Sequence, residues 1–246
     1  MYALQKQIGV LMKTLGLIGG IGPESTIDYY KMLIKKYREI KGENEYPSFL
    51  INNINMTEML DYIKNKKNEE LVKYLSNEIN KIEKAGADFA ALASNTPHLV
   101  FDELQKNVNI PLISIVEETV KFCAKRGFVN TGLFGTMFTM EAGFYQQIGE
   151  KYSVKVKIPE ENERKFIHEI YFNELVPGII KESTRKKLVE IACNLKDKCG
   201  ISGLILGGTE LPLILKQEEF KDIVILNTSE IHINAIIKKM INNEDF

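Results

Sequence analysis

The chain has no tryptophan, three cysteines, three histidines and a formal net charge of −1. Cys123, Cys193 and Cys199 are an odd number without a close-spaced pair, which argues against a disulfide framework or a zinc site. We expect all three as buried thiols on helices, as is usual in a reducing cytoplasm. No two histidines stand at a metal-ligand spacing, so no metal is expected.

Two classes of partner are also excluded by what is missing. Lys and Arg (32) nearly balance Asp and Glu (33) without a basic stripe, which argues against a nucleic-acid binder. No apolar run approaches the ~18 residues of a membrane helix. The apolar patch from 8 to 12 is too short for a secretory signal, and Met12-Lys13-Thr14 resembles a natural start, so 1–11 is predicted to be an N-terminal extension. The sequence thus predicts a cytoplasmic protein.

What the chain does have is an alternation of short apolar runs and helical patterns, which predicts an α/β fold with parallel sheets flanked by helices. We expect strands near 13–18, 48–53, 88–93, 111–115, 130–135, 153–158, 201–206 and 222–226. We expect helices over 24–41, 68–85, 97–107, 116–126, 138–150, 161–181, 184–199, 211–217 and 229–242.

An internal repeat divides the chain. The segment 15–19 is echoed by 131–135, and the Asn95-Thr96 turn by Gly208-Thr209. A duplicated α/β unit predicts two pseudo-symmetric lobes with a ligand cleft at the carboxyl ends of their strands. The predicted first lobe is 12–113 plus 222–246, with the terminal helix packed back on it, and the second lobe is 114–221.

Two strand–turn–helix boundaries, 90–98 and 204–213, are the sharpest features. Backbone N–H groups and threonine hydroxyls at a helix start favour an anion. Asn95, Thr96, Thr209 and Glu210 are therefore predicted to bind a small dicarboxylate or an amino-acid carboxylate. Glu210 has the alternative role of stabilising the start of its own helix.

Three further turns are candidates for the cleft. The glycine-rich turn containing Gly20 and Gly22 allows close approach of a ligand, and its spacing fits neither a dinucleotide nor a phosphate-binding motif, so no cofactor is expected. Asn52 either points into the cleft or caps its turn. Thr136 and Thr139 either bind a carboxylate or cap a helix.

The histidines are candidate acid–base groups. His98, in the first turn of its helix, is expected to make a structural hydrogen bond. His168, Tyr171 and Glu174 recur at three-residue spacing, which places them on one helix face. That face is either plain surface or a lid that brings a group titrating near neutral pH over the cleft.

Several of these segments in this order resemble the aspartate/glutamate racemase family of cofactor-independent amino-acid racemases, over about 12–241. The pieces are Gly19-Gly20-Ile21-Gly22-Pro23, Ala85-Gly86-Ala87-Asp88, Asn95-Thr96-Pro97-His98, Glu117-Glu118-Thr119, Gly135-Thr136 with Thr139-Met140, and Gly208-Thr209-Glu210-Leu211-Pro212-Leu213. The resemblance implies two lobes, a homodimer, an active site between the lobes, and two thiols that handle the α-proton from opposite faces.

This chain departs from that pattern at both thiols: the residue before Asn-Thr is Ser94, and the residue before Thr-Glu is Gly208. A serine is a poor base without a partner, and glycine has no side chain. The predicted catalytic groups are therefore Ser94 with His168 or Glu210. The alternatives are a lyase or hydrolase acting on a small carboxylate, with His98 as the partner of Ser94, and a non-catalytic carboxylate-binding protein, which Gly208 favours. The predicted substrate-binding residues are Gly20, Gly22, Asn52, Asn95, Thr96, Thr136, Thr139, Gly208 and Thr209.

Overall fold

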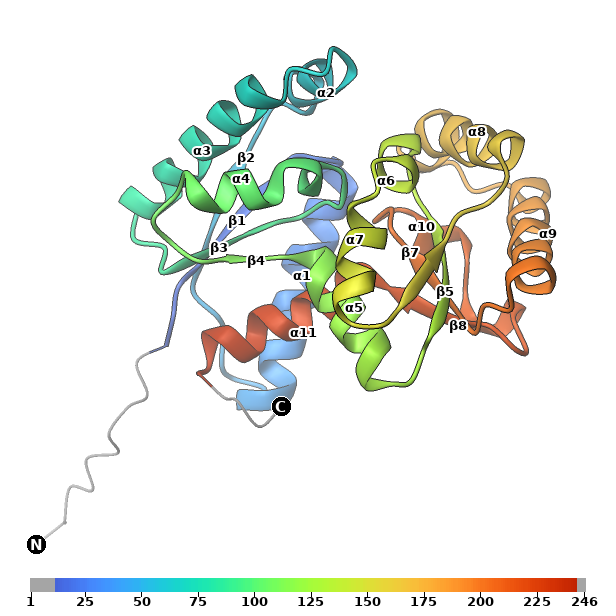
Figure 1. The fold of residues 1–246 in the computed structure, drawn as a ribbon. Helices are drawn as coiled ribbons and strands as arrows, with labels where there is room; N and C mark the ends of the chain where they lie inside the picture. Colours follow the sequence, from blue (N-terminus) through green and yellow to red (C-terminus); the bar gives the residue numbers. More distant parts are fainter. Residues whose placement is uncertain (1–11, 243–246) are drawn as a thin grey trace, which may run out of the picture.

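The computed structural model describes residues 12–242, and the extension expected at 1–11 lies outside them. Two four-stranded parallel sheets form two lobes side by side (Figure 1), which confirms the predicted α/β class. The first sheet has the order β2-β1-β3-β4, with β1 (Leu15–Gly19), β2 (Phe49–Asn53), β3 (Phe89–Leu92) and β4 (Leu112–Ile113). The second has the order β6-β5-β7-β8, with β5 (Asn130–Phe134), β6 (Lys155–Lys157), β7 (Gly203–Leu206) and β8 (Val224–Asn227).

The central strands are apolar because helices cover both faces of each sheet. Every residue of β1, β3 and β7 is buried, whereas the edge strands β2 and β6 alternate with exposed positions. Continuous apolar runs of this kind are typical of parallel strands. The polar turns that follow them are therefore held on a rigid scaffold.

The helices of the first lobe are α1 (Pro23–Lys41), α2 (Met56–Lys64), α3 (Asn68–Lys84), the 3₁₀ turn η1 (Thr96–Val100) and α4 (Phe101–Lys106). Those that follow are α5 (Ile115–Lys125), α6 (Met137–Glu141), α7 (Phe144–Lys151), α8 (Glu161–Ile170), the π-helical turn η2 (Tyr171–Leu175), α9 (Glu182–Cys199), α10 (Leu211–Ile214), the 3₁₀ turn η3 (Gln217–Glu219) and α11 (Thr228–Met240). The sequence analysis missed α2.

Two predicted helices are interrupted. The helix expected over 138–150 is split into α6 and α7 at Gly143, whose φ of 82° belongs to the left-handed region. The helix expected over 161–181 leaves α-helical geometry at Tyr171, where the Val176 amide donates to the Tyr171 carbonyl five residues earlier, at 2.9 Å. The second interruption determines which way Tyr171 faces.

The repeat seen in the sequence corresponds to equal strand orders in the two sheets. Gly16 lies in β1 and Gly132 in β5, the strand at the same position of each sheet. A Cβ at Gly16 would overlap Ile82 of α3, and one at Gly132 would lie 2.9 Å from Leu195 of α9. Both glycines therefore let a helix pack closely on the central strand.

One boundary of the predicted lobes is wrong. Strand β8 pairs with β7, with Leu206 opposite Asn227, so it belongs to the second sheet and not to the first lobe. The physical reason is that β8 is the counterpart of β4 and completes the second sheet. Helix α11 then returns to the first lobe, where Ile233 and Ile237 share a core with Leu15 and Tyr29.

The cysteines differ from expectation in their burial. Cys123 is buried, but Cys193 is exposed and Cys199 is partly exposed, because these two lie away from the core-facing side of α9. Within 12–242 there is no group of His, Cys, Asp or Glu side chains able to hold a metal ion. Among the same residues, no helix combines the length and the apolar character needed to cross a membrane.

Candidate functional site

The turns after the two central strands of each sheet meet between the lobes. In the first lobe these turns carry the glycine-rich segment after β1 and Ser94–Thr96 after β3; in the second they carry Thr136 after β5 and 208–210 after β7. Ligands of open α/β sheets bind at the carboxyl ends of strands. We call the set of polar side chains at this junction the interlobe site; it consists of Ser94, Thr96, Thr136, Thr139, Thr209 and Glu210.

Three threonine hydroxyls connect the lobes directly. Thr96 Oγ1 lies 3.5 Å from Thr136 Oγ1 and 3.4 Å from Thr139 Oγ1, and the last two are 3.1 Å apart. The Thr139 amide also donates to Thr136 Oγ1 at 3.2 Å, so Thr136 caps α6. All three threonines are buried. Hydroxyls both donate and accept hydrogen bonds, so these three side chains have the chemistry needed to bind the oxygens of a carboxylate.

The Asn95 side chain makes structural hydrogen bonds beside the three threonines. Tyr145 donates its hydroxyl proton to Asn95 Oδ1 at 2.7 Å, and Asn95 Nδ2 donates to Thr228 Oγ1 at 3.2 Å. Thr228 in turn donates to the Leu206 carbonyl at 2.8 Å. The side-chain amide predicted to bind substrate is thus engaged in joining β3 of the first lobe to α7, α11 and β7.

Glu210 is the titratable group of the interlobe site. It is 2% exposed, and its Oε2 accepts a very short hydrogen bond from the Tyr171 hydroxyl and one of 2.9 Å from Thr209 Oγ1. Burial raises the pKa of this carboxyl above its ordinary value. The Glu210 carboxylate is thus hydrogen-bonded to two neighbouring hydroxyl groups.

The Glu210 carboxylate packs against the glycine-rich turn of the first lobe. Gly20 and Gly22 have φ of 80° and 91°, which side chains rarely adopt, and a Cβ at Gly22 would overlap Glu210 Oε1. The Gly20 amide donates to Thr26 Oγ1 at 2.8 Å, which fixes the turn. The close approach that the glycines allow is therefore made by a carboxylate of the opposite lobe.

Asn52 does not point toward the interlobe site. Its Nδ2 donates to Glu78 Oε2 at 2.8 Å and to the Glu78 carbonyl at 3.1 Å, on α3. The contacts of Asn52 thus do not support the prediction that it binds substrate. The side-chain amide that lies against Gly20 belongs to its neighbour Asn53. Side chains alternate along a strand, so the two asparagines face opposite ways.

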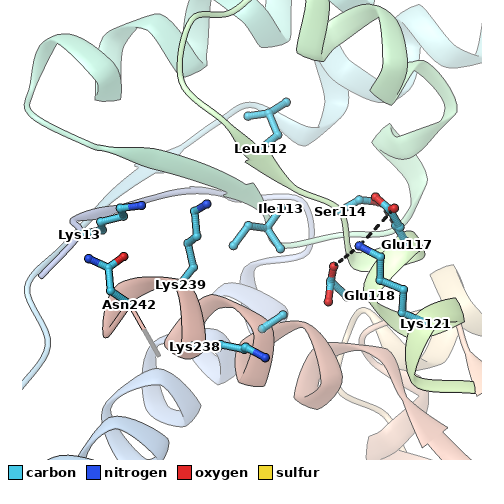
Figure 2. Close-up of a pocket in the computed structure, with 11 residues that line it drawn as sticks. Lys13, Leu112, Ile113, Ser114, Glu117, Glu118, Lys121, Lys238, Lys239 and Asn242 are labelled. Atoms are coloured by element: carbon cyan, nitrogen blue, oxygen red, sulfur yellow. Dashed lines mark hydrogen bonds and ion pairs between the residues drawn. The ribbon is translucent and has the colours of Figure 1, made fainter. Parts of the chain in front are cut away.

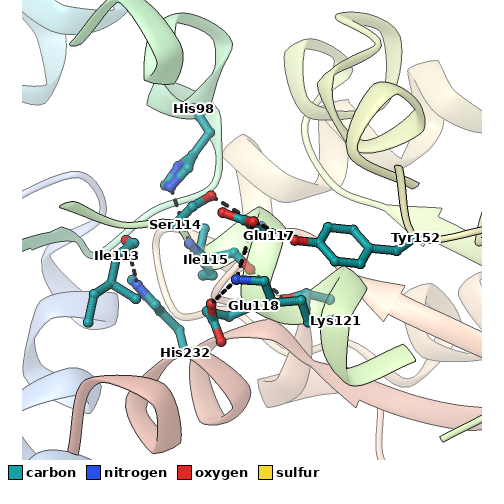
Figure 3. A network of polar contacts seen from close by, with 10 residues as sticks. His98, Ile113, Ser114, Ile115, Glu117, Glu118, Lys121, Tyr152 and His232 are labelled. Atoms are coloured by element: carbon teal, nitrogen blue, oxygen red, sulfur yellow. Dashed lines mark hydrogen bonds and ion pairs between the residues drawn. The ribbon is translucent and has the colours of Figure 1, made fainter. Parts of the chain in front are cut away.

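His98 makes the structural hydrogen bond expected of it. The Ile115 amide at the start of α5 donates to His98 Nε2 at 3.3 Å (Figure 3), and the ring stacks on Phe101 with centroids 4.9 Å apart. Burial lowers the pKa of His98 to about 3, so the ring is neutral. Within 12–242 the Ser94 hydroxyl has no hydrogen-bond partner, His98 included. The hydrolase alternative, which needs this pair, loses its base.

His168 fixes the start of α6. Its Nδ1 accepts a 3.1 Å hydrogen bond from the Met137 amide, and its half-buried ring makes edge contacts with Phe138 and Phe172. Burial lowers the pKa of His168. Among the described residues it makes no hydrogen bond to Ser94 or Glu210.

The helix face proposed for His168, Tyr171 and Glu174 does not exist. Tyr171 turns inward to Glu210, whereas Glu174 accepts from Thr184 Oγ1 at 2.7 Å and pairs with Lys181. The π-helical turn η2 changes the angle between successive side chains, so a three-residue spacing no longer places them together.

The two helix starts beside the site differ from each other. The helix expected over 97–107 begins as the 3₁₀ turn η1 and continues directly as α4 to Lys106, whereas α10, expected over 211–217, has only four residues. Because the dipole sums over aligned peptides, a single turn such as α10 provides little of the anion stabilisation of a full helix. Binding of an anion on the second lobe would depend on hydroxyls and individual amides.

An open pocket lies elsewhere, between β4, α5 and α11. Its volume is about 610 Å³, and Figure 2 shows Lys13 and Lys239 on one side and Glu117, Glu118 and Lys121 on the other. The two glutamates pair with Lys121 at 3.2 and 3.1 Å. This pocket shares no residue with the interlobe site, whose members are at most 8% exposed. The interlobe site is thus closed to solvent in this structure.

Sequence reasoning missed what fills the space beside Gly208. A Cβ at Gly208 would overlap Tyr171 Cε2 and lie 3.2 Å from the Tyr171 phenol oxygen. The available signal was the combination of a glycine where a side chain was expected and a tyrosine three residues after His168.

Comparisons with known proteins agree with this geometry. The family described as Asp/Glu/hydantoin racemase matches residues 18–236. A crystal structure of an aspartate racemase homologue from Pyrococcus horikoshii is 37% identical with a TM-score of 0.81, covering 92% of this chain and 98% of that one. One from Yersinia pestis, proposed to be an Asp/Glu racemase, is 30% identical with a TM-score of 0.85 and the same coverage. The broad-specificity amino-acid racemase RacX of Bacillus subtilis is 28% identical over 172 residues, 68% of this chain and 69% of RacX.

Proposed function

The chain belongs to the Asp/Glu/hydantoin racemase family, and we propose that it is a cofactor-independent racemase acting on a small amino acid of the aspartate or glutamate type. The observation that carries the proposal is the meeting of Thr96 from one lobe with Thr136 and Thr139 from the other. Hydroxyls from both lobes suit a carboxylate held between them, with its α-carbon reachable from both sides. The homodimer stays a prediction from the family resemblance.

Racemisation needs a proton-transfer group on each side of the α-carbon, and the lobes offer one each. Ser94 lies on the first lobe and Glu210 on the second. Burial raises the pKa of the Glu210 carboxyl and so brings that pKa closer to neutral pH. A carboxylate with a raised pKa is also a stronger base once it is ionised. The Ser94 hydroxyl lacks a neighbouring base, so we assign it the weaker role of donor on its face. His168 holds the start of α6, and thereby Thr136 and Thr139, in place.

The test is exchange of the α-proton in deuterated water, with L- and D-amino acids offered separately. We expect loss of the α-proton NMR signal together with inversion, read by circular dichroism, for at least one small amino acid. Thr139→Val removes a hydroxyl of the cluster and should raise KM by about tenfold, the equivalent of one ~1.4 kcal/mol hydrogen bond. Thr131→Val is the matched control, since Thr131 is buried in β5 and bonds only the Lys155 carbonyl, at 3.5 Å.

A non-catalytic carboxylate-binding protein is the second candidate, and Gly208 favours it, because position 208 offers no acid–base group. Calorimetry separates the two. An amino acid that binds saturably and exchanges no α-proton over days would support the binding protein and reject the racemase.

A further inference from the structure

The side chain of Tyr171 occupies the space into which a side chain at Gly208 would project. The ring edge overlaps the position of a Cβ there, and the phenol oxygen lies 3.2 Å from it. Ser94 and Gly208 each lie two residues after the end of a central strand, β3 and β7 respectively. The phenol of Tyr171 therefore occupies the place that a side chain of residue 208 would take.

Tyr171 is also chemically connected to the one buried carboxyl of the interlobe site. Its hydroxyl donates to Glu210 Oε2, and Thr209 Oγ1 donates to the same oxygen at 2.9 Å. Tyr171 is 7% exposed and Glu210 is 2% exposed. A phenol and a carboxyl in direct contact inside a closed cleft can pass a proton from one to the other without water.

The local backbone is built to place the ring there. Tyr171 begins the π-helical turn η2, and π-helical turns occur frequently at functional sites. The turn directs the ring away from the face of His168 and toward the carboxyl end of β7. Phe172 packs against the Tyr171 ring with centroids 5.6 Å apart, which limits its movement.

We propose that Tyr171 is the residue that exchanges the proton with the α-carbon on the second-lobe face, with Glu210 behind it as the proton reservoir. This rests on the proposed racemase function and names the group that touches the substrate. The Cα–H bond breaks and its proton joins the phenol oxygen, while the original O–H proton of Tyr171 passes to Glu210. The electron pair stays on the α-carbon and spreads into the substrate carboxylate. The reverse transfer through Tyr171 restores the original C–H bond and gives exchange without inversion. Inversion follows when the Ser94 O–H proton forms the new C–H bond on the other face, after which Ser94 takes a proton from water and Glu210 gives its proton to water.

Burial is consistent with this order of events. The pKa of Tyr171 is raised well above its ordinary value by burial and by the neighbouring carboxylate, so the phenol does not ionise by itself at neutral pH. A concerted transfer avoids the phenolate, because the carboxylate accepts the proton as the phenol receives one.

The decisive variant is Tyr171→Phe, which removes the hydroxyl and keeps the ring against Gly208. We expect the rate of α-proton exchange in deuterated water to fall by about 100-fold or more, the usual scale of general acid–base catalysis, with KM changed less than about threefold. Glu210→Gln should cause a comparable loss. Tyr152→Phe is the matched control, since Tyr152 also donates to a carboxylate, Glu117 at 2.6 Å, but outside the interlobe site. It should exchange like the wild type.

The possible outcomes distinguish failure of the Tyr171 inference from failure of the proposed racemase function. If the wild-type protein exchanges no α-proton of any amino acid, the racemase proposal fails, and this inference fails with it. If the wild type exchanges and Tyr171→Phe stays within about threefold of it, Tyr171 is not the proton-transfer group and only this inference is overturned. Unchanged exchange in Glu210→Gln would refute the relay. Should Tyr171→Phe not fold by circular dichroism, Tyr171→Leu, which also removes the hydroxyl, is judged by the same threshold.

Discussion

The Tyr171 ring occupies the place that a Cβ of residue 208 would take, so the two positions determine each other: the ring fits there only because residue 208 has no side chain. From the sequence, the lack of a side chain at 208 favoured a site without a catalytic group. In the structure, it is what allows a second residue to pack at that position. That second residue is a tyrosine that comes from a different element, 37 positions earlier in the chain.

Gly208→Ala should therefore destabilise the protein by about 1–3 kcal/mol, the usual cost of overpacking. The φ of Gly208 is not in the left-handed region, so the cost would come from the ring and not from the backbone. Urea unfolding of Gly208→Ala, Tyr171→Ala and the double variant forms a cycle. In the Tyr171→Ala background the cost of Gly208→Ala should vanish. An equal cost in both backgrounds would show that the ring is elsewhere.

The link between the lobes through Asn95 predicts a second effect on stability. Tyr145→Phe leaves the buried Asn95 Oδ1 without its 2.7 Å donor, which should cost about 1–3 kcal/mol. Tyr62→Phe is the matched control, because Tyr62 also donates to a side-chain oxygen, at 3.1 Å to Glu58, but in an exposed place. It should cost less than about 0.5 kcal/mol. Similar losses in chemical denaturation of the two variants would mean that the Asn95 contact does not hold the lobes together.

Stability should fall as the pH falls from about 6.5 toward 5. Burial lowers the pKa of His98 to about 3 and that of His232 to about 4, so below 6.5 the unfolded chain takes up protons that the folded chain excludes. Each histidine contributes a slope of up to about 1.4 kcal/mol per pH unit in that window. Glu210 acts with the opposite sign, because its raised pKa makes the folded state take up a proton first.

His232 is the histidine to remove in testing this slope. Its Nε2 donates to the Ile113 carbonyl at 3.0 Å and its Nδ1 accepts from Tyr29 at 2.9 Å, so the folded ring is neutral. Urea unfolding of His232→Gln at several pH values should give a slope reduced by up to about 1.4 kcal/mol per pH unit between pH 6 and 5. A slope equal to that of the wild type would show that His232 is protonated in the folded state.

The strands, the repeat and the turns were accessible from the sequence because each depends on short-range patterns. Buried parallel strands have the pattern of apolar runs, and the similar spacings of Gly16 to Gly132 (116 positions) and of Thr96 to Thr209 (113 positions) indicate a duplicated unit. Thr136 and Glu210 could be proposed because polar residues directly after such strands lie at one edge of a sheet.

Other features depend on how distant segments meet. Asn52 turned out to bond Glu78 because the alternation of side chains along β2 points it toward α3, and a sequence does not show which face α3 covers. Strand β8 joined the second sheet because an unpaired edge of β7 was available there.

By itself the sequence determined that two similar α/β lobes present hydroxyls and a carboxyl at the ends of their central strands, since apolar periodicity and turn residues act locally. Only the tertiary structure decided which of these groups meet. The π-helical turn brings Tyr171 to Gly208 and Glu210, and the closure of the lobes brings Glu210 to Gly22. Both contacts join segments that are far apart in the chain, and packing alone selects them.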